Sequence, residues 1–522
     1  MKVRKKDVCH TCRRRKLRCD GKHPACSQCL SSNRLCEGYP DILFVPFSTT
    51  PGVLKPRSPP VASNGTSKPT RQHQRQAGAA PSFGPQPTSA HVSQPIFYSQ
   101  GDRSLPLDPS SHKILVDWPC NHPVYTLLPA ALHDNIQLIL NNYVPRSELQ
   151  RDVVNFNPHS PRICGSWVTA LPGLTLGATG ALGECLDSAI RALALSITAR
   201  RTGKELLRPI SFYYAHTLRL LQSDLQMADR AYKSERVAVA MCLALLEVLS
   251  PTKSYSWLVH VGGVSELIGS LSPEFFSGGV HHTLFVGFRP LLILRAFMLR
   301  QATFFADQGW VEKPFQRYKA TPLQNLLSLA AKIPKCLEDI DAIEDQPPTS
   351  AIIAASETLA ELLEIRAGLD SWSCSLTADS SAPPFWHLES GDTVECRNNL
   401  LWFRDLSAAN LYTHLWSFQV ICLSHIQNLL VRYPELERFH VATLENTTQL
   451  RDACVKLSIM IFQSMEYILQ EDFMLYGFSS AGFPLYTACK ALELDEQGRA
   501  VLGRLDRTVL DRSDIQKLQM LH

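Results

Sequence analysis

The sequence predicts three parts in order: a small cysteine-rich module, a disordered Pro- and Ser-rich linker, and a large all-α domain. Three observations on the 522-residue chain lead to this fold class. Six of the 16 cysteines lie within the first 36 residues, and 12 prolines fall within residues 46–110. From residue 113 onward apolar residues recur at helical spacing, and alternating strand patterns are scarce. The expected boundaries are 1–40 for the module, 41–112 for the linker and 113–522 for the helical domain.

The positive charge of the chain is concentrated in the module. Residues 1–40 carry eleven Lys or Arg against three acidic residues, a net charge of +8, so the other 482 residues carry −4. This asymmetry indicates a polyanionic partner for the module. A solvated basic tail without a function would have the same charge, but it would not need regularly spaced cysteines.

The six cysteines of the module repeat one spacing, C-x2-C-x6-C, in two tandem halves. They are Cys9, Cys12, Cys19, Cys26, Cys29 and Cys36. Disulfides are disfavoured, because the basic start without an apolar run does not resemble a signal peptide. Thiolates at this spacing can bind zinc, which takes four ligands. Two separate sites need eight ligand positions, so either one cysteine of each half bridges both ions, or His10 and His23 complete the set. Bridging is preferred, because His10 adjoins Cys9 and would have to turn to another face.

Residues 9–36 resemble the Zn₂Cys₆ binuclear-cluster domain of fungal transcription factors. The resemblance rests on all six cysteines, on the basic run 13–18 between the second and third, and on Pro24 between the halves. It implies two Zn²⁺ per chain, with Cys9 and Cys26 bridging, Cys12 and Cys19 completing one site, and Cys29 and Cys36 completing the other. Some 28 residues with few large apolar side chains cannot bury a core. Zinc would therefore supply the folding energy, an apparent ~10–16 kcal/mol in small finger peptides.

Each half is expected to carry a short helix directly after its C-x2-C, the first over 13–18 and the second over 30–34. Modules of this class place such a helix in the major groove, where Lys or Arg can donate to O6 and N7 of guanine. By position, Lys16 aligns with the family lysine that reads a CGG triplet, and Arg15 lies beside it. Arg13, Arg14 and Arg18 are expected to contact phosphates. A basic arm, which attracts DNA of any sequence, is formed by Lys2, Arg4, Lys5 and Lys6.

The linker lacks the coiled coil that follows the cluster in many members of this family. Residues 37–112 contain no run of a/d heptads, and their prolines would break one. Their composition predicts a flexible tether. Two states on DNA therefore stay open: a monomer, or a homodimer formed through the helical domain. Residues 37–45 resemble the tail of one branch, in which the rest of the chain is a fungal-specific transcription factor regulatory domain.

The helical domain is predicted from apolar faces at i, i+3, i+4 spacing, taken in chain order. One segment, 235–249, is apolar almost all round, as expected for a central buried helix. Further helices are expected near 401–432 and 448–470. The amphipathic faces are Leu132, Ile136, Ile139, Leu140 and Tyr143; Leu182, Leu186, Ala189, Ile190, Leu193 and Ile197; and Trp257, Val261, Val264, Ile268 and Leu271. Segments 257–263, 295–310 and 483–485 resemble the regulatory domain more loosely.

Several features of the helical domain could be interpreted as functional, but a structural interpretation explains each of them equally well. His260 is expected to be a core histidine, and His281 and His282 to lie in a loop. The acidic run 338–345 is either an activation segment or a solvated helix face. The ten remaining cysteines lack metal spacing and are expected to be small buried hydrophobes. No membrane span is expected, because 237–249 is too short and 284–299 is interrupted by arginines.

These observations predict a nuclear transcription factor that acts on RNA polymerase II promoters and reads CGG-containing double-stranded DNA. It would contact the transcription machinery and regulate one pathway, for example a secondary-metabolite gene cluster. The alternative is a ligand-gated regulator whose helical domain senses a small molecule of sterol or nutrient metabolism, in a pocket lined by residues such as Trp257 and Phe304. An enzyme is not expected, because Walker, dinucleotide, G-x-S-x-G and H-E-x-x-H motifs are missing and six thiolates close both zinc sites.

Overall fold

The computed structural model describes residues 27–32, 130–148, 166–226, 233–251, 256–343, 346–378, 383–388, 400–438, 446–493 and 498–499. The chain separates into two compact units, Met1–Ser104 and Leu105–His522. The division falls inside the predicted linker 41–112, which itself lies outside the described residues. In the first unit the described element is the helix α2 (Ser27–Ser31).

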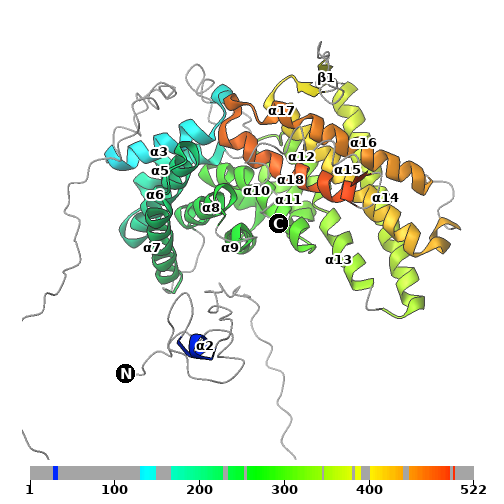
Figure 1. Cartoon of the computed structure of the whole chain (residues 1–522), viewed down its shortest axis with the longest axis horizontal. Coiled ribbons are helices and arrows are strands. Elements are labelled where there is room, and N and C mark those ends of the chain that lie inside the picture. The colour runs from blue at the N-terminus through cyan, green and yellow to red at the C-terminus, as the bar shows by residue number, and fades with distance from the viewer. Residues whose placement is uncertain are drawn as a thin grey trace, which may run out of the picture. The chain divides into compact units, whose positions relative to one another are not determined.

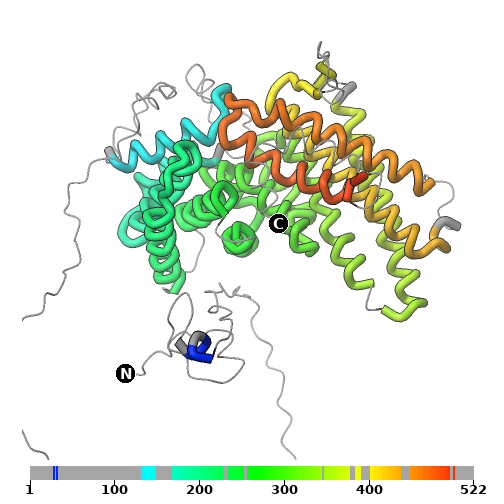
Figure 2. Tube along the Cα trace, in the orientation of Figure 1, coloured from blue at the N-terminus to red at the C-terminus, as the bar shows by residue number. Residues whose placement is uncertain are grey.

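The second unit is built almost entirely of helices (Figures 1 and 2). Its first half packs helices around α8, whose side chains are buried along nearly its whole length. Helices α6 and α9 pack directly against α8, and α7 covers α6. The elements are α3 (Ala130–Tyr143), η3 (Ser166–Ala170), α5 (Leu171–Gly177), α6 (Gly180–Thr202), α7 (Leu207–Gln226), α8 (Ser234–Leu249), α9 (Ser256–Gly269), η4 (Pro273–Ser277) and α10 (Gly279–Leu299).

The second half of this unit is centred on α15, which packs against α14, α16 and α18. A turn-rich stretch and short helices connect α10 to α14. The elements are η5 (Phe304–Ala306), α11 (Gln308–Glu312), η6 (Lys313–Phe315), α12 (Pro322–Ala330), α13 (Ile333–Ile343), α14 (Pro348–Ala378), β1 (Phe385–Leu388), β2 (Leu400–Phe403), α15 (Leu406–Arg432), η7 (Pro434–Arg438), α16 (Thr447–Gln463), α17 (Met465–Ile468), η8 (Glu471–Phe473) and α18 (Met474–Glu493).

The apolar faces predicted from the sequence lie in the core. The five residues of the first face are all buried in α3, and those of the second are buried in α6 except the half-buried Leu182. The prediction that 235–249 forms a central helix is confirmed by α8. An all-round apolar helix must be enclosed by neighbours, because no face of it is suited to water.

The predicted helix over 401–432 is wrong at its start, because Leu400–Phe403 is a strand. It pairs antiparallel with β1, with Phe385 opposite Phe403 and Leu388 opposite Leu400. Helix α15 begins only at Leu406, where the Asp405 carboxylate accepts a hydrogen bond from the Ala408 amide at 2.8 Å. Four apolar residues in a row suit a strand and a buried helix equally well, so periodicity could not separate them. The predicted helix 448–470 is likewise divided, at Ser464, into α16 and α17.

Helix α10 is long and apolar enough to cross a membrane by length and composition, and it is the one such helix among the residues that the structure describes. Core helices meet the same criteria. Arg289, at its centre, is fully buried and donates to the carbonyl oxygen of Gln324 at 2.9 Å and to Ser328 Oγ at 2.8 Å. Arg295 Nε donates to the Leu258 carbonyl at 3.2 Å. These bonds join α10 to α12 and α9.

One further expectation needs correction, and one open alternative gains an observation. His281 and His282 lie in the first turns of α10, not in a loop. There Nδ1 of His281 is 3.1 Å from Ser234 Oγ, and Nδ1 of His282 is 2.9 Å from the Phe276 carbonyl. The acidic run lies mostly on α13, where Asp341 forms an ion pair with Arg300. This part of the run is therefore a helix face whose carboxylates have structural partners.

Candidate metal centre and surface groove

The described part of the cysteine-rich module is the helical turn α2. It begins one residue after Cys26 and contains Cys29, whose exposed fraction is only 1%. The Ser32 hydroxyl donates to the Gln28 carbonyl at 2.8 Å and closes the carboxyl end of the turn. Cys29 is thus buried, whereas the neighbouring Gln28 is exposed.

The helix of the second half begins earlier than the predicted 30–34, inside the C-x2-C motif itself. Cys26 itself lies outside the described residues. Cys29 carries a thiol, which as a thiolate is a ligand that zinc takes, so the residue type at this buried position fits zinc.

The other predicted site residues lie outside the described part of the chain, so their roles remain predictions. They are the cysteines Cys9, Cys12, Cys19, Cys26 and Cys36 and the basic residues Lys5, Lys6, Arg13, Arg14, Arg15, Lys16 and Arg18. Within the described residues no group of three or more His, Cys, Asp or Glu side chains could hold a metal ion.

The buried histidines and cysteines of the helical unit are held in their neutral forms. His260 is buried, its Nε2 lies 2.8 Å from the Tyr214 hydroxyl, and burial lowers the pKa of its imidazole to about 4. His260 is thus a core histidine satisfied by a neighbour, as predicted. Burial raises the pKa of the Cys185 and Cys422 thiols to about 12, which makes them poor nucleophiles.

The prediction that the cysteines of the helical domain are buried is confirmed for six of those described and wrong for one. The buried ones are Cys185, Cys242, Cys336, Cys422, Cys454 and Cys489. Cys374, near the end of α14, is exposed. It lies five residues after Leu369, a buried residue of that helix.

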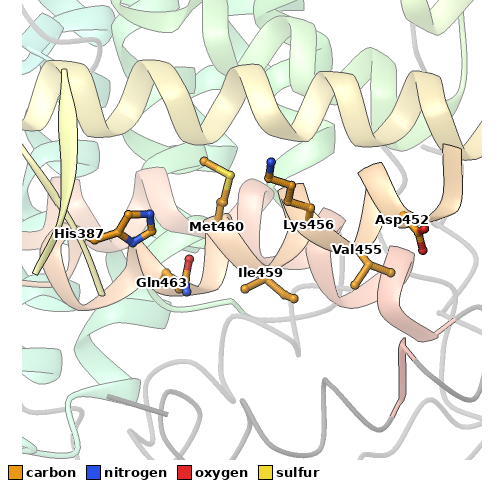
Figure 3. A pocket seen from close by; sticks show the side chains of 7 residues that line it. All are labelled: His387, Asp452, Val455, Lys456, Ile459, Met460 and Gln463. Atoms are coloured by element: carbon orange, nitrogen blue, oxygen red, sulfur yellow. The ribbon is translucent and has the colours of Figure 1, made fainter. Parts of the chain in front are cut away.

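A shallow groove of about 480 Å³ lies on the outer face of α16 (Figure 3). Six of its lining residues come from α16, and His387 of β1 closes one end. Figure 3 shows Lys456 and Met460 along one side of α16 and Val455 and Ile459 along the other. The lining residues are His387, Asp452, Val455, Lys456, Ile459, Met460 and Gln463. No sequence pattern points to this groove, because its two parts are more than sixty residues apart.

The groove differs from the sensor pocket that the sequence suggested around Trp257 and Phe304. The Phe304 ring packs on Phe305 and Trp310, with centroid separations of 4.2 and 4.9 Å. Trp257 is buried in the core against which these residues pack. Both aromatic side chains therefore fill space in the core, and neither lines the groove on α16.

Comparison with known proteins bears on the amino-terminal module. The family model of the fungal Zn(2)-Cys(6) binuclear cluster domain matches residues 7–43. Residues 7–43 are a binuclear zinc cluster domain. A curated relative from Schizosaccharomyces pombe, named Transcriptional regulatory protein moc3, is 52% identical over 40 residues, which is 8% of each chain. The chain thus matches only a small part of that relative's length, and no solved structure matches it.

The zinc cluster domain takes two zinc ions per chain, as its six cysteines predicted. Cys29 would hold zinc as a thiolate, and the buried setting on α2 would keep water away from its sulfur. When bound, zinc would supply folding energy that the few apolar side chains of the module cannot. The large helical unit, in contrast, has an extensive apolar core of its own.

Proposed function

We propose that the protein is a nuclear, DNA-binding regulator of transcription by RNA polymerase II. The match of residues 7–43 to the binuclear zinc cluster domain carries the proposal. The net charge of +8 on residues 1–40 supports it, since a basic module suits the phosphate backbone of DNA. The similar segment in a relative named as a transcriptional regulatory protein agrees with this assignment.

At the finer level, we propose that Lys16 reads the guanines of a CGG triplet, with Arg15 beside it. Arg13, Arg14 and Arg18 then contact phosphates, which orient the module without selecting a sequence. Cys9 and Cys26 bridge the two zinc ions. Control of a single pathway, such as a secondary-metabolite gene cluster, follows from the resemblance noted in the sequence.

The test is selection from randomised DNA by the full-length chain, with and without a zinc chelator. The proposal expects enrichment of a CGG motif that disappears on chelation. Lys16→Ala should lose about 5- to 150-fold in affinity for CGG DNA, since a good base contact contributes about 1–3 kcal/mol of discrimination. Lys22→Ala, a basic residue of the same module between its halves, serves as the matched control and should keep the CGG preference.

The retained sequences also distinguish the two states on DNA. One triplet per fragment is expected of a monomer, and two triplets at fixed spacing are expected of a homodimer. Binding that survives chelation and shows no motif would refute the proposal and leave only a basic tail that binds DNA through its charge.

A further inference from the structure

The two-stranded sheet of β1 and β2 carries apolar side chains on both of its faces. On the inner face, the Phe385 ring packs on the rings of Tyr412 and Trp416 of α15, with centroid separations of 5.2 and 5.3 Å. Side chains alternate between the faces of a strand, so Trp386 and Leu388 lie on the outer face, where they are 42% and 40% exposed. An antiparallel sheet with one face toward water usually carries polar side chains there. The outer face of β1 is therefore suited to a partner.

Strand β1 also leaves one backbone edge unpaired among the described residues. The Arg404 amide donates to the Pro384 carbonyl at 3.2 Å, so these two residues form a hydrogen-bonded pair of the antiparallel ladder. Such pairs alternate along the ladder. Trp386 therefore bonds toward β2, whereas the N–H and C=O groups of Phe385 and His387 point away from it. Within the described part of the chain, no other backbone group bonds to these groups of Phe385 and His387.

This edge of β1 is the accessible edge of the sheet within the described residues. Figure 1 shows β1 at the margin of the helical unit, whereas Leu401 and Phe403, which form the far edge of β2, are buried. Natural edge strands are usually protected by charged residues, prolines or bulges. None of the four residues of β1 is a Lys, Arg, Asp, Glu or Pro. Pairing through this edge is therefore unopposed, and with a single accessible edge it ends at two copies.

Antiparallel pairing of β1 with β1 of a second copy satisfies these backbone groups in one register. In that register, Phe385 lies opposite His387 of the partner subunit, and the reverse pair forms by symmetry. Each such pair exchanges two N–H···O=C bonds, which gives about four in all, and a register shifted by two residues would halve this number. The Trp386 residues of the two copies then lie directly opposite each other, with Cα atoms about 4.5 Å apart.

We propose that β1 is the contact surface of a homodimer, in which two copies join their sheets edge to edge into one four-stranded antiparallel sheet. A second copy is favoured over a charged partner, because the strand has no charge to pair with. It is also favoured over a flexible peptide, because a strand that is already ordered loses little conformational freedom on pairing. Of the two states on DNA that the sequence leaves open, the proposal selects the homodimer, and only this consequence rests on the proposed function.

The size of the surface sets the strength of the dimer. The exposed parts of two Trp386 and two Leu388 side chains amount to roughly 350 Å². Stable interfaces bury more than about 1,000 Å². The dimer is therefore weak, and we expect a Kd between about 1 µM and 1 mM.

The test is disulfide formation between two copies of Trp386→Cys, without DNA, in a Cys374→Ser background that removes the one exposed thiol among the described cysteines. A separation of about 4.5 Å falls within the Cα distances that a disulfide spans. Leu388→Cys, on the same face of the same strand, is the matched control, because its two copies would lie roughly 14 Å apart. Oxidised glutathione should link Trp386→Cys chains at least tenfold faster than Leu388→Cys chains.

Charge variants test the same contact without a covalent bond. Trp386→Lys places two like charges opposite each other and should raise the dimer Kd at least tenfold, measured by small-angle X-ray scattering over a concentration series. Trp386→Glu alone should do the same, and an equimolar mixture of the two variants should recover the dimer. Recovery on mixing cannot come from a misfolded chain. Ile353→Lys, at an isoleucine 61% exposed on α14, should leave the Kd unchanged.

Three results would overturn the proposal. Equal linking rates for Trp386→Cys and Leu388→Cys would indicate random collisions and not a defined register. A dimer that Trp386→Lys leaves intact would place the contact elsewhere on the protein. A chain that stays monomeric up to about 1 mM would leave the edge of β1 to an extended segment of another protein.

Discussion

The ion pair between Arg236 and Asp224 provides a quantitative test of the helical unit. It joins the first turn of α8 to the end of α7, with Arg236 Nε 2.6 Å from Asp224 Oδ2. The side chains are only 1% and 14% exposed. Asp224→Ala leaves the arginine charge in the core without this carboxylate. Removing one partner of a buried pair costs about 3–5 kcal/mol, and the small exposure of Asp224 places this case near ~3 kcal/mol.

An exposed pair on the same unit serves as the control. Lys490 Nζ lies 3.0 Å from Glu493 Oε2, but these side chains are 58% and 48% exposed. Water screens such a pair, so Glu493→Ala should change the free energy of unfolding by less than about 1 kcal/mol. The double variant Arg236→Met/Asp224→Leu removes both buried charges and should recover most of the stability that Asp224→Ala loses.

The assay is urea unfolding of the full chain, followed by circular dichroism at 222 nm, which reports the helical unit. The midpoint should fall for Asp224→Ala while the slope stays unchanged, because the exposed surface on unfolding is the same. Equal midpoints for Asp224→Ala and Glu493→Ala would refute the argument that burial sets the strength of this pair. A double variant less stable than Asp224→Ala would refute it as well.

Other predictions concern metal, pH and packing. Removal of zinc by a chelator should abolish DNA binding, measured by fluorescence anisotropy, and leave the 222 nm signal of the helical unit largely intact, since that unit has its own apolar core. Burial lowers the pKa of His260, His414 and His425 to about 4, so the stability from keeping them neutral is complete above pH 6.5 and is lost as the pH falls toward 4. Each contributes about 3 kcal/mol at most, and urea midpoints measured across this range should fall in that direction. Gly477→Ala would force a methyl group against a backbone carbonyl and should cost about 1–3 kcal/mol in urea unfolding, whereas Gly173→Ala meets nothing within 4 Å and should not destabilise.

The sequence predicted the interior of the helical unit better than its boundaries. The burial of α8 and of the α3 face follows from apolar spacing, because a helix can satisfy such a pattern only by packing it inside. The strand at Leu400–Phe403 could not be predicted from apolar spacing, because it forms by pairing with Phe385–Leu388, a separate segment of the chain. His281 and His282, expected in a loop, instead lie in α10. Gly279, with φ of 65°, begins that helix just before them.

The two candidate sites also differ in how far the sequence predicts them. A metal centre restricts its ligands to few residue types at short spacing, so six cysteines in two equal halves are enough to predict zinc from the sequence alone. The groove on α16 has no such signature, since it exists only where β1 meets the outer face of a helix more than sixty residues away. The zinc cluster domain can therefore be recognised from the sequence. Any control that the helical unit exerts depends on tertiary surfaces, and residues such as Lys456 and Ile459 become candidates only once their neighbours are known.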